Sequence, residues 1–180
     1  MRYIKKIVNI ISVFFIVMVF IGCEFNESLP QKFVVFKKDL IGKWKIIDNK
    51  DYPIVIISNN NREYIFKTYE TNSDKSQEIS AYLYDLDYLK ILQLNFGIKK
   101  KPFFGRYELL KIDFLSKDKI LLTHIDFAKF KEIVDDYNKS NKLKKYDYAD
   151  VPSSLIYKLI KENKDTLFLN TKHALLKKVE

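Results

Sequence analysis

The hydrophobic positions of this chain begin as one continuous run and only later alternate with polar ones. Residues 7–22 read IVNIISVFFIVMVFIG, in which Asn9 and Ser12 are the polar side chains. The preceding residues 1–6 contain three cations and no acid. A basic start, a short apolar stretch and a small final residue are typical of an export signal, whereas a spanning helix needs about 20 apolar residues. The pattern therefore predicts a signal peptide over residues 1–22.

From residue 43 the apolar positions come in short runs separated by polar, turn-forming segments. Such runs predict strands over 43–47, 54–57, 64–69, 78–85, 89–96, 106–115 and 119–125. In 106–115, a period of two places Glu108, Leu110, Ile112 and Phe114 on a mostly apolar face. The opposite face is mixed, so one side of the sheet is expected to be buried. We expect an antiparallel meander that is strongly curved or barrel-like.

After Ile125 the apolar spacing changes to three and four, which is typical of helices. We expect a helix of about 11 residues after Asp126, whose carboxylate would accept from the first turn. Ser153 or Ser154 is expected to cap a second helix, followed by a short strand over 166–169. Thr171 is expected to cap a terminal helix that carries Leu175, Leu176 and Val179. The predicted fold class is α+β, with C-terminal helices packed on the sheet or closing it.

Composition supports one globular unit after the signal. The chain has 180 residues, of which 47% are hydrophobic and 15% aromatic, as in proteins with an ordinary core. Residues 24–30 are polar and contain one proline, so 23–38 is expected to be a modified N-terminus and tether. Residues 39–180 are expected to form a single domain, because the apolar faces of the helices need the sheet to cover them.

The single cysteine of the chain, Cys23, directly follows Gly22. The stretch Phe20-Ile21-Gly22-Cys23 resembles the lipobox of bacterial lipoproteins, with phenylalanine where leucine is usual. The resemblance implies cleavage between Gly22 and Cys23 and attachment of acyl chains such as palmitate to Cys23. It also implies an exported protein held on the bacterial cell membrane or outer membrane. The alternative is an uncleaved N-terminal helix anchor with an incidental cysteine.

Two weaker resemblances concern the rest of the chain. Gly42-Lys43-Trp44 resembles the G-x-W signature of lipocalin-like barrels, in which tryptophan closes the barrel floor and glycine lets the backbone pass close beside it. The alternative is a core tryptophan on a first strand. The C-terminal half, from Tyr107 onward, is similar in layout to uncharacterised bacterial lipoproteins. That similarity implies a fold and a location but no activity.

No combination of residues in the sequence predicts catalysis. The two histidines, His124 and His173, lie on different predicted elements, and Asp126 is the acid near His124. Structural histidines are therefore expected, with no metal site and no cofactor. The chain has four glycines and no G-x-S-x-G motif, so neither a phosphate-binding loop nor a nucleophile elbow is expected. A buried cluster of His124, Asp126 and a third polar group would favour an enzyme.

The formal net charge of +9 indicates an anionic partner. Two basic clusters are candidate anion-binding residues: Lys99, Lys100, Lys101 and Arg106, and Lys142, Lys144 and Lys145. Export argues against nucleic acid and favours anionic lipid headgroups or envelope polymers; the alternative is a set of solvated, lysine-rich loops.

The function predicted is that of a binding or interaction module of the cell envelope. It would take a small apolar ligand in the cup of the sheet, or a partner at the basic face. The alternative is an envelope hydrolase, or another enzyme, with an unrecognised site.

Overall fold

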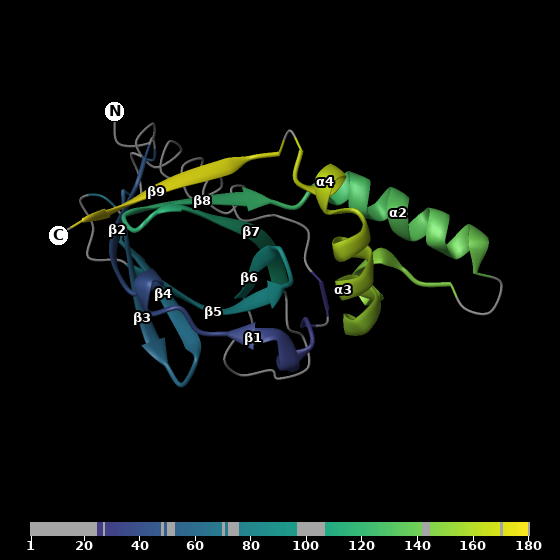
Figure 1. Ribbon diagram of the computed structural model, residues 1–180, viewed down its shortest axis with the longest axis horizontal. Helices are drawn as coiled ribbons and strands as arrows, with labels where there is room; N and C mark the ends of the chain where they lie inside the picture. Colours follow the sequence, from purple (N-terminus) through teal and green to yellow (C-terminus); the bar gives the residue numbers. More distant parts are fainter. Residues whose placement is uncertain are drawn as a thin grey trace, which may run out of the picture.

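A closed barrel forms the main body of the protein (Figure 1). The computed structural model describes residues 25–26, 28–47, 49, 53–69, 71, 76–96, 107–141, 145–169 and 171–179. Within these ranges nine strands form one sheet, and eight of them close into an antiparallel barrel. The barrel strands are β2 (Gly42–Ile46), β3 (Ile54–Asn60), β4 (Glu63–Tyr69), β5 (Ser76–Leu86), β6 (Leu89–Asn95), β7 (Tyr107–Ser116), β8 (Lys119–His124) and β9 (His173–Val179).

The order of the barrel strands is that of a meander completed by one late strand. Strands β2 to β8 pair with their neighbours in sequence, as the alternating pattern predicts. Strand β9 lies between β8 and β2, where Ile120 is opposite Leu176 and Leu176 is opposite Ile46. All seven strands expected between residues 43 and 125 overlap an observed strand.

The inward side chains of the barrel form one apolar core. Every barrel strand contributes to it, because alternate residues of a strand point to the same face. The predicted apolar face of β7 is confirmed, since Leu110 and Ile112 belong to this core. Its principal members are Trp44, Val55, Ile57, Tyr64, Phe66, Ile79, Leu83, Leu92, Leu94, Leu110, Ile112, Ile120, Leu122 and Leu176.

The prediction of a terminal helix after Thr171 is wrong, because residues 173–179 form β9. Alternation places Leu176 in the barrel core and leaves Lys177 exposed. A strand at this position pairs with two neighbours at once, and these backbone hydrogen bonds outweigh the local helical spacing. The Thr171 hydroxyl donates to the backbone oxygen of His124 at 2.7 Å instead of capping a helix.

In the described part of the chain, three α-helices pack on the outside of the barrel and lie together at one side of it (Figure 1). They are α2 (Phe127–Ser140), α3 (Ser153–Glu162) and α4 (Lys164–Leu167). The apolar side chains of α2 and α3, among them Phe130 and Ile156, form a second core with Tyr84, Ile91 and Leu109, which belong to β5, β6 and β7. The helices therefore cover these strands, and β9 rather than a helix closes the barrel.

Three local expectations for the region after residue 125 differ in outcome. Asp126 does precede α2, and its Oδ1 accepts from the backbone N–H of Lys129 at 3.0 Å. The short strand expected over 166–169 is wrong, because residues 164–167 form α4 and bury Leu167. Helix α3 begins at Ser153 with Pro152 at its N-cap, which is one residue before the expected serine caps.

The N-terminal segment from Phe25 to Val35 lies along the barrel. The backbone N–H of Phe25 donates to the oxygen of Tyr107 at 2.8 Å, and the N–H of Tyr107 donates back at 3.0 Å. The N–H of Leu29 donates to Gln93 Oε1 at 2.7 Å. After η1 (Gln31–Phe33), β1 (Val34–Val35) pairs with β5 as the ninth strand. In its described part, the segment expected to be a tether is thus held on the domain.

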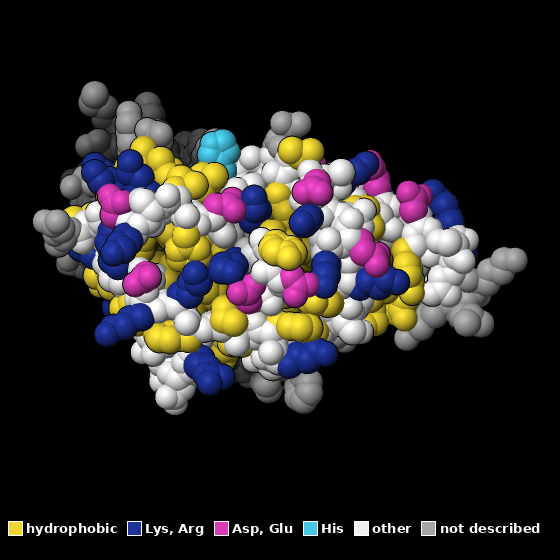
Figure 2. All heavy atoms as spheres, in the orientation of Figure 1, with side chains coloured by type: hydrophobic (Ala, Val, Ile, Leu, Met, Phe, Trp, Pro, Cys, Tyr) yellow, Lys and Arg dark blue, Asp and Glu magenta, His cyan; other side chains and the backbone are white. Residues whose placement is uncertain are grey.

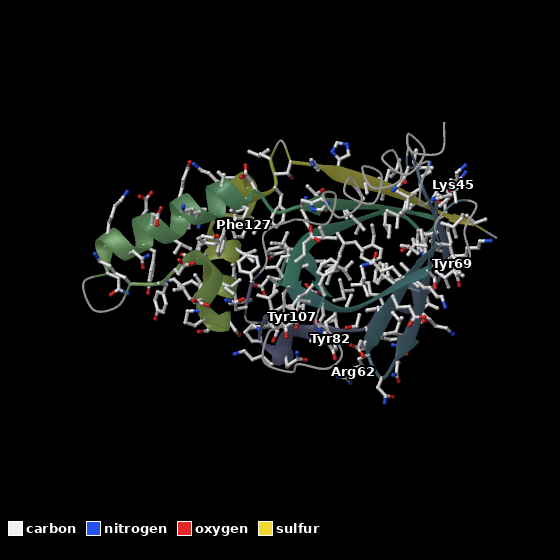
Figure 3. All side chains as sticks on the ribbon, turned by 180° about the vertical axis from the view of Figure 1, so that it is seen from behind. Lys45, Arg62, Tyr69, Tyr82, Tyr107 and Phe127 are labelled. Carbon is white, nitrogen blue, oxygen red and sulfur yellow. The ribbon has the colours of Figure 1, made fainter. Side chains whose placement is uncertain are left out.

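The outer surface near this segment carries further aromatic side chains. Phe25 packs edge-on against Phe127 and Phe130, with ring centroids 5.7 and 5.0 Å apart. Figure 3 shows Tyr107 on the barrel wall, where β7 begins, and Phe127 at the start of helix α2. Phe25 therefore connects the start of the described chain with both the barrel and α2.

Candidate functional site

The interior of the barrel contains a partly enclosed cavity of about 100 Å³. Inward positions of the strands supply apolar side chains to its wall, and the pattern of alternation is what aims them there. The apolar lining consists of Ile46, Val55, Phe66, Ile79, Leu92, Leu94, Leu110, Leu122, Ala174 and Leu176.

Three polar residues complete the lining of the cavity: Asn49, Thr68 and His124. Asn49 follows β2, Thr68 is near the end of β4, and His124 is the last residue of β8. Because neighbouring strands are antiparallel, these three strands end at the same end of the barrel. We call this end the rim. The cavity is therefore apolar inside and polar at the rim.

A buried acid stands next to the rim histidine. Glu108 Oε1 lies 2.7 Å from His124 Nδ1, and the Glu108 side chain is 2% exposed whereas that of His124 is 20% exposed. The strand register explains the contact. Leu110 is directly opposite His124, and Glu108 is two residues earlier on the same face of β7. The distance is that of an ion pair, yet neither oxygen of Glu108 accepts a well-aligned hydrogen bond within the described structure.

The partner of His124 is not the acid that the sequence indicated. Asp126 is engaged by the first turn of α2, through the N–H of Lys129. Glu108, rather than Asp126, lies beside the imidazole. The sequence analysis did not identify Glu108 as a site residue. The signal was present, since Glu108 is an acid on the apolar face of a predicted strand. Its partner depends on the pairing of β7 with β8, which no local pattern reveals.

The opposite end of the barrel is closed around Trp44. Its side chain is 1% exposed, and its indole N–H donates to the oxygen of Leu40 at 2.9 Å. Lys178 Nζ lies 5.2 Å from the centre of the Trp44 ring and donates to the oxygen of Asp39 at 2.9 Å. Gly42 has a φ of +139°, and a Cβ at this position would approach Lys178 Cε to 2.9 Å. Glycine therefore leaves room for the lysine that covers the tryptophan.

Tyr64 joins the segment before β2 to the same closed end. Its hydroxyl accepts from the N–H of Lys37 at 2.6 Å and donates to the Lys37 oxygen at 3.2 Å. Burial raises the pKa of Tyr64 above its ordinary value, although the hydrogen bond from the Lys37 backbone opposes that shift. The hydroxyl thus stays protonated at neutral pH and can make both bonds.

The predicted basic clusters lie almost entirely outside the described residues, so they stay a prediction. Lys145 is exposed, while Lys99, Lys100, Lys101, Arg106, Lys142 and Lys144 lie outside the described residues, as do Gly22 and Cys23. Figure 2 shows lysine and arginine side chains spread over the visible face and interspersed with acids. On the outer wall of the barrel, Lys177 of β9 lies directly opposite both Lys45 of β2 and Lys119 of β8.

Among the described residues, no group of three histidine, cysteine, aspartate or glutamate side chains is placed to hold a metal ion. None of the helices in the described ranges has the length and apolar character needed to cross a membrane. Comparisons of the chain with protein-family models, with curated proteins and with solved structures found no match.

Proposed function

We propose that this protein is a binding module that holds a small apolar group inside its barrel. The observation that carries the proposal is the cavity of about 100 Å³, with its apolar wall and polar rim. Sites for small molecules are concave and mostly apolar, with few polar groups that fix orientation. An engineered apolar cavity of about 150 Å³ accepts benzene, so this one suits a short alkyl chain. A longer ligand would extend past the rim.

We also propose that the barrel is held directly on a membrane of the bacterial envelope by a lipid on Cys23. Phe25 is fully buried against the barrel and α2. Two residues span at most about 7 Å, so a lipid on Cys23 would leave almost no free chain. The excess of lysines would add an attraction to anionic headgroups or envelope polymers, which salt screens.

A lipocalin-like relation belongs to the same proposal. It is supported by the closed barrel and by the position of Gly42 and Trp44 on its first strand. The support is structural, and the proposed ligand class rests on the cavity rather than on this relation.

The second candidate is an envelope hydrolase, and the Glu108–His124 pair is what favours it. A histidine oriented by a carboxylate is two parts of a nucleophilic triad. Within the described residues, however, no hydroxyl or thiol side chain is bonded to the His124 ring. Binding accounts for the apolar wall, whereas hydrolysis would need a nucleophile in addition. Binding is therefore the function that this site supports better.

Filling the cavity tests the binding proposal. Ala174→Phe places a ring in the cavity, whereas Ser58→Phe adds the same ring to an exposed position of β3. Native mass spectrometry of the full chain should show a co-purified small molecule on the wild type and on Ser58→Phe, and none on Ala174→Phe. An adduct on all three proteins, or on none, would contradict ligand binding in the barrel.

The lipid anchor has a separate test. Cys23→Ser should abolish labelling of the protein by a radioactive fatty acid and slow its migration in gels, because the signal is then retained. Membrane association is not the readout, since the variant keeps its apolar N-terminus. Equal labelling of wild type and variant, or an unlabelled wild type that retains residues 1–22, would favour the uncleaved anchor.

A further inference from the structure

The two nitrogens of the His124 ring differ in their surroundings. Nδ1 is 2.7 Å from Glu108 Oε1, while Nε2 has no bonding partner among the residues that the structure describes. The ring lines the cavity and its side chain is 20% exposed. Nε2 is therefore the nitrogen of the rim histidine that is left for a bound molecule.

Glu108 contacts the other ring nitrogen, Nδ1, and so can determine which way Nε2 points. A carboxylate that is 2% exposed has lost its water, and neither of its oxygens accepts a well-aligned bond within the described structure. Unsatisfied buried groups of this kind are rare in native proteins and call for a reason. A carboxylate at one ring nitrogen fixes the orientation of the imidazole and so determines which nitrogen faces a ligand. Glu108 lies at the distance from Nδ1 that such a positioning residue needs, although the bond is not aligned in the described structure without a ligand.

We propose that His124 Nε2 is the hydrogen-bonding contact for the head group of the ligand, that Glu108 positions it, and that the ligand is an apolar molecule with a hydroxyl head. This inference rests on the proposed binding function. The tail would lie among Phe66, Leu92 and Leu94, and the head would lie at the rim.

The choice of a hydroxyl follows from the chemistry of the pair. A hydroxyl both donates and accepts, so it can bond to Nε2 whether or not the imidazole carries a second proton. A carboxylate head can only accept and an ammonium head can only donate, so each would suit a single protonation state of the ring. A plain hydrocarbon would leave Nε2 without a partner.

The test uses the full chain and two probes of equal chain length, 1-hexanol and hexane. Methyl resonances of the cavity leucines report entry of the tail, and the ¹⁵N resonances of the two histidines of the chain report the head. We expect 1-hexanol to shift the methyl signals and His124 Nε2, and to leave His173 unchanged. Hexane should shift the methyl signals alone.

Variants separate a specific contact from a structural one. His124→Phe keeps a ring at the rim but removes the hydrogen bond to the head group. It should weaken 1-hexanol binding about three- to tenfold, which corresponds to the net free energy of one hydrogen bond, and leave hexane binding unchanged. The matched control is His173→Phe, at an exposed position of β9, which should bind both probes as the wild type does. Glu108→Gln retains an acceptor for Nδ1 and should rescue 1-hexanol binding that Glu108→Leu loses.

Any other result would contradict either ligand binding in the barrel or the proposed head-group contact. If neither probe shifts the cavity methyls, ligand binding in the barrel fails and the head-group contact fails with it. If both probes enter but 1-hexanol leaves His124 Nε2 unshifted, binding stands and the contact is wrong. Equal weakening of both probes by His124→Phe would assign the ring a packing role only. Should that variant not fold, the wild-type ¹⁵N shifts decide the question alone.

Discussion

Glu108 is the residue whose placement runs most clearly against the rules of stability. A buried acid in an apolar core lowers stability unless it is paired and hydrogen-bonded. Here Glu108 contacts His124 Nδ1 at 2.7 Å and has no well-aligned hydrogen bond in the described structure. A residue that costs stability in this way is expected at sites that serve a function.

Replacing this acid by an apolar residue should stabilise the protein. We expect Glu108→Leu to raise the free energy of unfolding by about 1–3 kcal/mol, because a buried acceptor without a well-aligned hydrogen bond costs that much. The His124 left behind is partly exposed and can be hydrated. Urea unfolding measures the difference, with Glu132→Leu at an exposed site of α2 as the control. A large loss of stability would show instead that the ion pair holds β7 and β8 together.

For single residues, the sequence predicted that Glu108 lies on the apolar face of β7, but it did not predict the contact with His124. A period of two places Glu108 with Leu110 and Ile112, and this holds in the structure. The approach of His124 requires the register of β7 on β8, in which residues 110 and 124 are opposite. Register depends on the turn and on the whole barrel, so local spacing favoured Asp126, which is two positions from His124.

Among the elements, β9 shows how neighbours decide between two patterns. The stretch HALLKKV places Leu175, Leu176 and Val179 at helical spacing, and Ala174, Leu176 and Lys178 at strand spacing. Both readings are locally acceptable. The open edges of β2 and β8 decide, because a strand between them pairs on both sides. The seven meander strands were predictable because their turn-forming breaks leave a single period.

Two adjacent leucines distinguish the strand from the helix. Leu176 is 2% exposed inside the barrel, whereas Leu175 is on the outer face and only half-buried. We expect Leu176→Ala to lower the free energy of unfolding by about 2–5 kcal/mol, as for other buried leucines. Leu175→Ala should cost less than half as much. Equal losses in urea unfolding would indicate that both leucines face the same core, as on a helix.

At the scale of the whole molecule, the barrel core and the core under the helices share a wall. Strands β5, β6 and β7 place Leu83, Leu92 and Leu110 in one core, and Tyr84, Ile91 and Leu109 in the other. The same three strands support both cores. If either core unfolds, these strands lose their packing on one face, and the other core is weakened as well. We therefore expect one cooperative unfolding transition.

Phe130→Ala tests this coupling from the helical side. Phe130 is fully buried in the core under the helices, and its truncation should cost about 3–5 kcal/mol. Trp44, the single tryptophan, reports the barrel core by fluorescence, and far-ultraviolet circular dichroism reports the helices. Both midpoints should fall by the same amount. A shift seen by circular dichroism alone would show that the helices unfold separately.

The position of β9 also has a consequence for the order of events during synthesis. The Lys178 side chain reaches the backbone of Asp39, a separation of 139 positions in sequence. The ribosome makes β9 after every other described element. While the helices are translated, the edges of β2 and β8 are therefore still unpaired. Contacts this distant form slowly, and open edges invite wrong pairing in the meantime. The barrel can therefore close only after the last of the described strands has been translated.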